Sequence, residues 1–500
     1  MKHYLTTPIY YASGAPHLGH AYTTILADTY KRFWALCGDE VRLVSGTDEH
    51  GQKIERTAAA AGVPVTDFVA DRSKEFARLW HELGLDIDRF ERTTSKLHRG
   101  VALAIWRRLV SAGDIYRGNY EGLYCVECEQ YFTEGDTCPV HRRALEFSAE
   151  PAWFFRLSRY QQALLDYIER HPDFISPRVR ANEVLSFLRE NALRDLAVSR
   201  ASTSWGIPVP GDSSSVLYVW IDALASYLSA LLEEDTTDLD APSVQAWWQN
   251  TRHFIGKDIL TFHAIYWPAL LWSAGLPLPR QIVVNGWLTV EGKKISKSDP
   301  ATIVDPRTLL PLVGRDGLRL YFLRAVTLGQ DVDFSRQRLI ELVNSDLANN
   351  LGNLHARFAT LAIRHFGGRL HCTGPLETSD SELLAVVQAA ANEVSDAFQT
   401  NAPATGARAF VLACSAVNTW FQQQAPWQQE NQARRPVVLW VTSQALADLS
   451  VPGLVFVPEL AGELRRRLGL PEAALWVDIG KRRETLLVHD GPPLYPRVRG

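Results

Sequence analysis

The stretch Pro16-His17-Leu18-Gly19-His20 decides the fold of this 500-residue chain. It follows a β-branched and aromatic run at residues 3–11 and precedes an apolar-periodic segment at residues 21–36, which predicts a strand-to-helix turn. A helix N-terminus presents unpaired N–H groups, and residues i and i+3 lie on one face. The two histidines can therefore reach one phosphate group, and Gly19 leaves room for a nucleotide. The alternative is two polar residues on an exposed first turn.

A lysine cluster far downstream, Lys293-Lys294-Ile295-Ser296-Lys297-Ser298, strengthens the phosphate interpretation. The chain has 10 Lys and 42 Arg, so it uses Arg where a plain positive charge suffices. Lys is a mobile point charge that can follow phosphates as charge moves during a reaction, whereas Arg is a rigid fork. The cluster favours phosphate chemistry over its alternative, a solvated basic loop.

Composition indicates several packed domains and no membrane span. Hydrophobic residues make up 46% of the chain, and no run of 18 or more apolar residues occurs. The start Met1-Lys2-His3-Tyr4 has no export signal, so we expect a soluble, cytoplasmic protein, with an organelle matrix as the alternative. The net charge of -4 neither indicates nor excludes an RNA partner, because a local basic surface matters more than the total.

Alternating strand and helix patterns predict an α/β fold with a doubly wound parallel, Rossmann-type sheet. A strand at residues 40–45 ends at Gly46-Thr47-Asp48-Glu49-His50-Gly51. Because ligands bind at the carboxyl ends of such strands, Asp48 can hold an ammonium group; capping the next helix is the alternative. We expect helices at 53–61, 66–83, 95–112 and 259–274, and later strands at 216–219, where the sheet resumes, 252–255 and 281–285.

Two pairs of metal-ligating residues lie in an insertion that splits this sheet domain. Cys125 and Cys128 form the first pair, and Cys138 and His141 form the second. The set predicts a closed Cys3His site for one structural Zn²⁺, which would stabilise a module with little core of its own. A CxxC pair alone could be redox-active, but the second pair favours zinc.

The turn at Gly256-Lys257-Asp258 follows a predicted strand and could meet a phosphate and a ribose hydroxyl, or Asp258 could simply cap a helix. From Phe334 onward the pattern is mainly helical, which predicts an all-α bundle. We expect its helices at 335–364, 379–399, 403–424, 430–447 and 456–468.

In content and order, these motifs resemble the methionyl-tRNA synthetase family of class I aminoacyl-tRNA synthetases. The resemblance covers nearly the whole chain, including residues 6–11, the HLGH turn, the zinc knuckle, Tyr218-Val219-Trp220 and the lysine loop. It implies that L-methionine is activated by ATP with Mg²⁺ and is then transferred to the terminal ribose of methionine tRNA. The single knuckle resembles the subtype with one zinc.

The resemblance also implies roles for individual residues. Those expected to stabilise charge on the phosphates, each by about 3–4 kcal/mol as a fixed donor, are His17, His20, Lys294 and Lys297. Those expected to bind ATP are Gly19, Gly256, Lys257, Asp258, Ser296 and Ser298. Those expected to form the methionine pocket are Ile9, Tyr11, Asp48, Trp220, Ala223, Leu224, Tyr227, Ile259, Phe262 and His263, with Asp48 on the amino group and the Tyr227 hydroxyl at the thioether.

For the anticodon, the resemblance implies Asn353, Arg357, Pro426 and Trp427. An aromatic face can stack on an unstacked base while Arg and Asn bind its edges. Six segments are then expected: the first half of the catalytic domain (1–112), the zinc-knuckle insertion (113–216), the second half (217–290), a lysine-loop and tRNA stem-contact segment (291–333), the anticodon-binding bundle (334–470) and a tail (471–500). With no appended dimerisation domain evident, we expect a monomer.

The lysine loop departs from the family pattern. Ile295 stands where the family usually has Met, and Asp299-Pro300-Ala301 stands where Leu-Gly-Asn or similar is usual. Pro300 restricts a loop that is expected to move, so we expect an effect on rate more than on the type of reaction. Two alternatives stay open: a tRNA-independent amino-acid ligase or adenylyltransferase with the same HxGH and KISKS chemistry, and a non-catalytic RNA-binding homologue.

Overall fold

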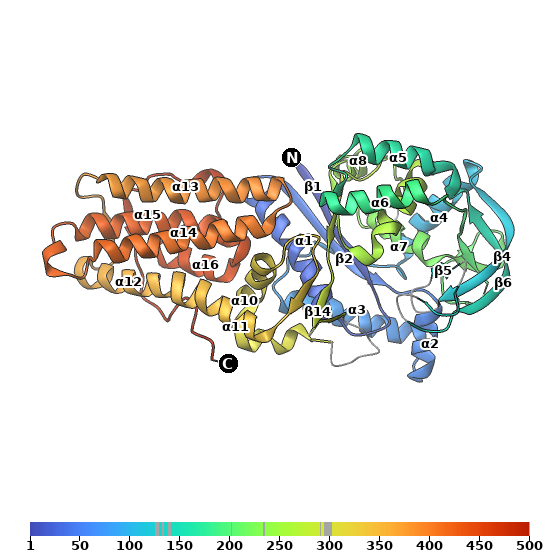
Figure 1. Ribbon diagram of the computed structural model, residues 1–500, viewed down its shortest axis with the longest axis horizontal. Coiled ribbons are helices and arrows are strands. Elements are labelled where there is room, and N and C mark those ends of the chain that lie inside the picture. Colours follow the sequence, from blue (N-terminus) through green and yellow to red (C-terminus); the bar gives the residue numbers. More distant parts are fainter. Residues whose placement is uncertain are drawn as a thin grey trace. The chain divides into compact units, whose positions relative to one another are not determined.

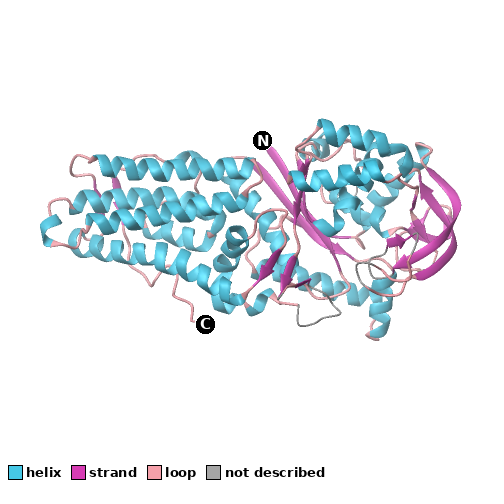
Figure 2. Ribbon diagram, in the orientation of Figure 1, coloured by secondary structure: helices cyan, strands magenta, loops and turns pink. Residues whose placement is uncertain are grey.

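The computed structural model describes residues 1–125, 130–132, 135–138, 142–201, 203–233, 236–290, 292–294 and 303–499. They form two compact units. Unit 1 consists of Met1, His17–Val41 and Gly286–Gly500; unit 2 consists of Lys2–Pro16 and Arg42–Asn285. Figure 2 shows long helices as the main elements of the C-terminal part of unit 1, whereas unit 2 holds the long strands.

Unit 2 is built on a six-stranded sheet in the order β3-β2-β1-β12-β13-β7. Its strands are β1 (Lys2–Tyr11), β2 (Glu40–Asp48), β3 (Arg89–Arg92), β7 (Ile175–Ser176), β12 (Thr251–Gly256) and β13 (Gln281–Asn285). The pairs β2–β3, β1–β12, β12–β13 and β13–β7 are parallel. β12 and β13 are buried almost throughout, as in parallel sheets covered on both faces. The predicted doubly wound sheet is confirmed.

The strand order of this sheet reverses between β1 and β12. The parallel register places Thr6 of β1 beside His253 of β12, so the carboxyl ends of both strands lie at the same edge. Ligands of doubly wound sheets bind outside the carboxyl ends at such a reversal. The topology therefore places the candidate site of unit 2 near Tyr11, Asp48 and Gly256, which end β1, β2 and β12.

Eight α-helices are described in unit 2, several of them labelled in Figure 1. They are α2 (Gln52–Ala60), α3 (Val65–Glu82), α4 (Lys96–Ser111), α5 (Gln161–Arg170), α6 (Arg178–Glu190), α7 (Val219–Ser229), α8 (Pro242–Trp248) and α9 (Trp267–Ser273). The helix predicted at 259–274 is divided into the 3₁₀ turn η2 (Lys257–Ile259), the π-helix η3 (Phe262–Tyr266) and α9. π-helical turns are rare in proteins as a whole, and those that occur are often found at functional sites.

The strands of the insertion pair in antiparallel fashion, with one exception. Its four-stranded sheet contains β4 (Ile115–Cys125), β5 (Gln130–Phe132), β6 (Glu146–Phe155) and β8 (Leu196–Ala197). The strand β7 also lies within residues 113–216, yet it pairs in parallel with β13 at the edge of the main sheet. The insertion thus contributes one strand to the sheet that it interrupts.

The prediction that the main sheet resumes at Val216 is wrong. Val216 belongs to β11 (Asp212–Leu217), which pairs antiparallel with β9 (Ser199–Arg200) and β10 (Pro208–Val209) in a separate three-stranded sheet. Gly211 has a φ of 80° and allows the tight turn that folds β11 back on β10. β11 therefore pairs with its neighbours in the chain, and the next strand of the main sheet is β12.

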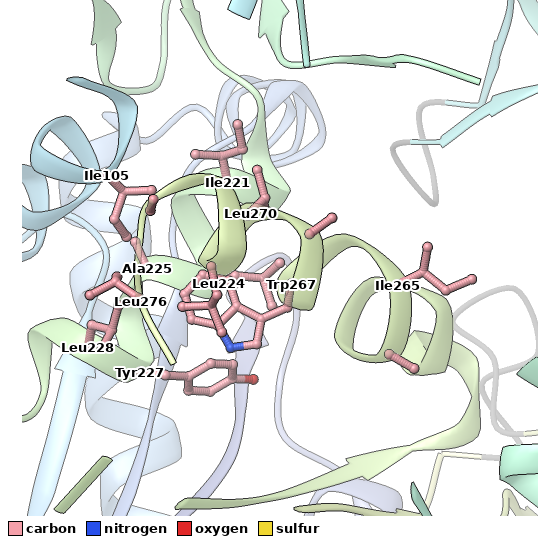
Figure 3. Packing of buried hydrophobic residues seen from close by; sticks show 14 of the residues in the cluster. Ile105, Ile221, Leu224, Ala225, Tyr227, Leu228, Ile265, Trp267, Leu270 and Leu276 are labelled. Carbon is pink, nitrogen blue, oxygen red and sulfur yellow. The ribbon is translucent and has the colours of Figure 1, made fainter. Parts of the chain in front are cut away.

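The core of unit 2 lies between α7, α4 and α9 (Figure 3). Ile221, Leu224, Ala225 and Leu228 of α7 pack with Trp267 in one buried cluster. These side chains occupy successive turns of α7, as an apolar helix stripe requires. The packing fixes the helix that carries much of the expected methionine pocket.

Unit 1 contains α1 and the C-terminal helices. Its other α-helices are α10 (Leu310–Ala325), α11 (Arg336–Val343), α12 (Asn353–Phe366), α13 (Thr378–Gln399), α14 (Pro403–Gln424), α15 (Arg435–Phe456) and α16 (Pro458–Arg467), after α1 (Leu18–Leu36). In Figure 1, α12 to α16 form the predicted bundle. The short strands described in unit 1 are β14 (Leu288–Val290), β15 (Lys293–Lys294), β16 (Val332–Phe334), β17 (Arg369–His371) and β18 (Thr485–Leu487).

Two helix boundaries in the bundle differ from the predictions. The helix predicted at 335–364 is α11 and α12 joined by the π-helix η6 (Asn344–Gly352). The helix predicted at 430–447 is α15, which continues through Pro452 to Phe456. Among the described helices, α15 alone is long and apolar enough to cross a membrane, but 94% of its apolar segment is buried inside the structure. It is the core helix of the bundle.

Candidate functional site

The HLGH turn forms the first turn of α1. His17 is the N-cap residue, and its Nδ1 accepts from the Gly19 N–H at 3.2 Å. His20 Nδ1 accepts from the His17 N–H at 3.1 Å, so the two side chains form a reciprocal capping box. Their rings stack with centroids 3.6 Å apart. The predicted strand-to-helix turn and the shared face of the two imidazoles are thus present.

This geometry fixes the tautomer of both neutral imidazoles. A ring nitrogen that accepts from a backbone N–H carries no hydrogen, so the hydrogen of each neutral ring lies on Nε2. Both histidines then have an N–H donor on the ring edge that the capping bonds do not use. Two adjacent donors of this kind suit the oxygens of a phosphate group.

The end of the lysine-loop segment is bonded to the same turn. The Leu18 N–H donates to the Val304 carbonyl at 3.0 Å. Upstream, β15 carries Lys294 and pairs antiparallel with β14, with Thr289 opposite Lys294. The chain that follows the loop, at Val304, is therefore fixed to the start of α1. Of the loop residues discussed above, Ile295, Ser296, Lys297, Ser298 and Asp299-Pro300-Ala301 lie outside the described residues.

In unit 2, the predicted ligand-binding residues gather at the carboxyl edge of the main sheet. Ile9 and Tyr11 lie at the end of β1 and are half-buried, whereas Asp48 ends β2 and is buried. The Ala12 N–H donates to the Asp48 carbonyl at 2.9 Å and joins the two strand ends.

The Gly-Lys-Asp turn begins at the same edge of the sheet. A Cβ atom on Gly256 would lie 2.5 Å from Asp258 Oδ1, so the carboxylate folds back over the glycine. Lys257 is half-buried and begins the 3₁₀ turn that follows β12. Gly256, Lys257 and Asp258, three of the residues predicted to bind ATP, therefore stand where β12 ends.

The aromatic side chains of the expected methionine pocket form two contacting pairs. The rings of Trp220 and Phe262 stack with centroids 3.6 Å apart and an interplanar angle of 7°. The Tyr227 hydroxyl and His263 Nε2 are 2.7 Å apart. Ala223, Leu224, Phe262 and His263 are buried, and Ile259 is half-buried. α7 and η3 together thus bring the distant predicted residues into contact.

His263 is a neutral hydrogen-bond acceptor. Its Nδ1 lies 2.9 Å from the Ile259 carbonyl, which can only accept, so Nδ1 carries the hydrogen. The Tyr227 O–H therefore donates to Nε2. Burial lowers the pKa of His263 to about 4, against the Ile259 hydrogen bond, and burial followed by the charges of Tyr10 and Asp48 raises the pKa of Tyr227. The pocket is uncharged at its aromatic end and faces a buried carboxylate.

Sequence reasoning missed the residues that hold the turn from Asp48 to Gly51. The Glu49 carboxylate accepts from Arg92 at 2.7 and 3.0 Å and from Thr47 at 2.8 Å. The Trp205 indole N–H donates to the Glu49 carbonyl at 2.6 Å. Glu49 is buried, and its oxygens are occupied by protein donors, so it supports the turn.

Asp222 was also missed. It lies on α7, is 1% exposed, and accepts from His50 Nδ1 and from His98 Nε2, each at 2.6 Å. Burial alone would raise the pKa of Asp222, but the two histidines hold it at about 2. Burial alone would lower the pKa of His50, but the Asp222 charge raises it. The only sequence signal is a carboxylate within an apolar helical stripe.

His50 also lines a small hollow in unit 2. Arg200, Tyr124, Trp205 and Tyr218 form other parts of its wall. The Arg200 guanidinium is 5.0 Å from the Tyr124 ring centroid and 4.4 Å from that of Tyr218. A buried cation between two aromatic rings thus lines the same hollow as His50, which belongs to the Asp48 turn.

In the bundle, two predicted anticodon residues are in contact. The Arg357 guanidinium is 4.6 Å from the Trp427 ring centroid and 5.6 Å from that of Phe421, and it donates to Gln422 Oε1 at 2.6 Å. Trp427 is 38% exposed, so part of the residue is open to solvent. Asn353 lies one turn before Arg357 and is exposed. The Pro426 carbonyl accepts from Arg435 Nε at 2.6 Å and shapes the loop before the tryptophan.

The predicted zinc ligands are described only in part. Cys125 ends β4, and both Cys125 and Cys138 are buried. The Cys138 N–H donates to the Arg143 carbonyl, and the Arg142 N–H donates to the Cys138 carbonyl, each at 2.8 Å. Cys128 and His141 lie outside the described residues. Two buried thiols in a tightly turned module fit a soft metal.

Comparison with known proteins adds independent evidence to this geometry. The family described as "tRNA synthetases class I (M)" matches residues 3–148 and 135–359. The methionine–tRNA ligase of Thermosynechococcus vestitus is 41% identical over 93% of this chain and 89% of its own length. That of Mycobacterium bovis is 39% identical over 96% of this chain and 94% of its own length.

Solved structures agree with the sequence matches. Mycobacterium tuberculosis methionyl-tRNA synthetase in complex with methionyl-adenylate superposes with a TM-score of 0.94 at 37% identity, covering 99% of this chain and 100% of that one. Its free state gives a TM-score of 0.88 at 35% identity, covering 100% and 98%. Identity at this level along nearly the whole of both chains, on the same backbone, is what common descent produces, and this chain belongs to the methionine–tRNA ligases of the class I tRNA synthetases.

Proposed function

We propose that this chain activates L-methionine with ATP to methionyl-adenylate and transfers the methionyl group to the terminal ribose of methionine tRNA. The observation that carries the proposal is the pocket in unit 2. Its aromatic end, at Tyr227 and His263, is uncharged, and the charge of the buried Asp48 carboxylate acts on the Tyr227 hydroxyl. An ammonium group and an unbranched apolar side chain match these two ends.

In the first step, a methionine carboxylate oxygen attacks the α-phosphorus of ATP. The bond from that phosphorus to the bridging oxygen breaks, and pyrophosphate leaves. The Nε2–H donors of His17 and His20 and the ammonium groups of Lys294 and Lys297 stabilise the charge that builds on the phosphates. No general base is required, because the attacking carboxylate is already ionised.

The remaining nucleotide contacts are assigned to a second group of residues. They are Gly19, Gly256, Lys257, Asp258, Ser296 and Ser298. Gly19 carries no side chain at the start of α1, and Asp258 presents a carboxylate at the end of β12 for a ribose hydroxyl. Mg²⁺ bound through the ATP phosphates would neutralise part of their charge.

In the second step, a hydroxyl of the terminal ribose attacks the carbonyl carbon of the adenylate. The bond to the phosphate oxygen breaks, AMP leaves, and the hydroxyl proton is released. Specific tRNA binding is assigned to Asn353, Arg357, Pro426 and Trp427 in the bundle. An exposed aromatic face beside a guanidinium is the arrangement that binds an unstacked base.

We assign one structural Zn²⁺ to Cys125, Cys128, Cys138 and His141. The burial of Cys125 and Cys138 fits this assignment, because Zn²⁺ binds cysteine as the thiolate and balances its charge away from water. The metal would join Cys125, at the end of β4, to Cys138 and takes no part in the transfer chemistry. The protein is further proposed to act as a cytoplasmic monomer.

The test is methionine-dependent ATP–pyrophosphate exchange, run with methionine and with the other apolar amino acids, followed by charging of methionine tRNA. Exchange specific to methionine together with charging is the expected result. Exchange without charging would support a tRNA-independent ligase instead. No exchange with any amino acid, in protein that binds tRNA, would support a non-catalytic RNA-binding homologue.

A further inference from the structure

Asp222 links two histidines that come from separate elements. His50 Nδ1, in the turn after β2, donates to Asp222 Oδ2, and His98 Nε2, on α4, donates to Asp222 Oδ1. His98 Nδ1 lies 3.2 Å from Ser229 Oγ, seven positions after Asp222 on the same face of α7. Both carboxylate oxygens are therefore used, and their orientation is fixed.

The turn that carries His50 is itself held firmly at the sheet edge. The Glu49 N–H donates to Thr93 Oγ1 at 3.0 Å, and Arg92 binds the Glu49 carboxylate. The Gly51 N–H donates to the Trp205 carbonyl at 3.2 Å. A bond from His50 to α7 thus transmits the position of the turn to that helix.

The proposed substrate would extend between the same two elements. Asp48 in the turn is assigned to the amino group, and Trp220 and Tyr227 of α7 are assigned to the side chain. Asp222 lies on α7 between these two aromatic residues, and His50 lies two residues after Asp48. The bond between Asp222 and His50 therefore joins the turn of the amino-group site directly to the helix of the side-chain pocket.

We propose that Asp222, through its hydrogen bond to His50, is a positioning residue that determines which amino-acid side-chain length the enzyme activates. This inference rests on the proposed methionine activity. One C–C bond adds roughly 1.5 Å to a side chain, and a methylene in an apolar pocket changes kcat/KM by about 10- to 200-fold. A small displacement of α7 relative to the turn would therefore change the preferred length.

The test compares three amino acids in ATP–pyrophosphate exchange: methionine, the longer ethionine and the shorter S-methylcysteine. Asp222→Asn removes the charge and leaves one oxygen to accept. The matched control is Asp212→Asn, because Asp212 is also a buried carboxylate of unit 2, but accepts from Ser214 and Trp153 within the insertion. Thermal unfolding of each variant is recorded alongside the kinetics.

A second pair of variants tests the same bond from the His50 side. Asn carries an N–H donor at the branch position that Nδ1 occupies in His, so His50→Asn can keep the bond to Asp222, whereas His50→Leu cannot. This pair decides the question if Asp222→Asn does not fold.

The expected result is that Asp222→Asn and His50→Leu lower the ratio of kcat/KM for methionine over the two analogues by about 10-fold or more, mainly through KM, while Asp212→Asn and His50→Asn keep it. An unchanged ratio in folded Asp222→Asn or in His50→Leu would overturn the proposal, as would an equal loss with all three amino acids. If the unsubstituted protein shows no methionine-dependent exchange, the proposed function fails, and this inference fails with it.

Discussion

Replacing Tyr227 by Phe would test how the pocket recognises methionine. The phenyl ring keeps the contacts that the tyrosine ring makes with His253 and Trp267, whose centroids are 4.4 and 6.4 Å away. The substitution therefore removes one hydroxyl and little else. Among the described residues, it takes away the hydrogen-bond donor of His263 Nε2, the Tyr227 hydroxyl at 2.7 Å.

The size of the effect follows from burial. His263 is 1% exposed, so its Nε2 lone pair would lose its donor where water is scarce. Leaving a buried acceptor unpaired costs about 1–3 kcal/mol. The variant avoids this cost if the imidazole turns to find another donor. Methionine then binds only after the ring has turned back, so binding is weakened by about the same 1–3 kcal/mol. Because each 1.36 kcal/mol is a tenfold change in rate, we expect kcat/KM for methionine to fall about 5- to 150-fold.

The assay is methionine-dependent pyrophosphate exchange from pH 5.5 to 8, with Tyr116→Phe as the control. Tyr116 donates to Asp195 in the insertion, so its substitution removes a comparable hydroxyl away from the pocket. Burial holds the pKa of His263 at about 4, so the imidazole is neutral throughout this range and the methionine KM of the unsubstituted protein should stay flat. A KM that rises steeply below pH 6.5, or a Tyr227→Phe variant as active as the control, would refute the reasoning.

Three further outcomes follow from the site and the bundle. His20→Ala should lower the rate of methionine activation about 100- to 1,000-fold with a smaller change in methionine KM, whereas His81→Ala, on the exposed side of α3, should leave both unchanged. Trp427→Ala should remove about 1–3 kcal/mol of stacking free energy and so lower kcat/KM for tRNA charging, with normal pyrophosphate exchange. The Leu412→Ala variant, changed at an exposed residue of α14, should charge tRNA normally. Burial raises the pKa of Asp316 to about 6, so the native state binds this proton more tightly than the unfolded chain and stability should fall as pH rises from about 4 to 6. Asp316→Asn should flatten that dependence in amide hydrogen exchange of α16, and an unchanged slope would contradict the assignment.

Local patterns predicted the turn at the start of α1 because the deciding interactions are local. The capping bonds of His17 and His20 join residues two and three positions apart, so the sequence contains all the partners. The order of the motifs, through the family resemblance, predicted which residues form the pocket. It could not predict that Trp220 stacks on Phe262, since that depends on how α7 and η3 pack.

Predictions failed where pairing is decided at a distance or by burial. Residues 216–219 have the composition of a sheet strand, but Val216 and Leu217 belong to β11, which a glycine turn directs into a local hairpin. α15 runs through Pro452 because its residues are buried by neighbouring helices, and tertiary packing outweighs the low helix propensity of proline. β3 and β7 have four and two residues, too few for a periodic pattern to reveal.

The motif Gly46-Thr47-Asp48-Glu49-His50-Gly51 shows why similar charged residues in one motif need separate arguments. A sequence places all three ionisable side chains at a strand end and cannot rank them. In the structure, the Glu49 carboxylate is surrounded by Arg92, Thr47 and Thr94 as donors, so a substrate ammonium would have to displace protein donors to reach it. His50 is bonded to a carboxylate 172 positions away, and its contribution is to position α7. Asp48 is the carboxylate whose charge reaches the Tyr227 hydroxyl, which makes it the residue of the three that fits the amino group of a bound amino acid.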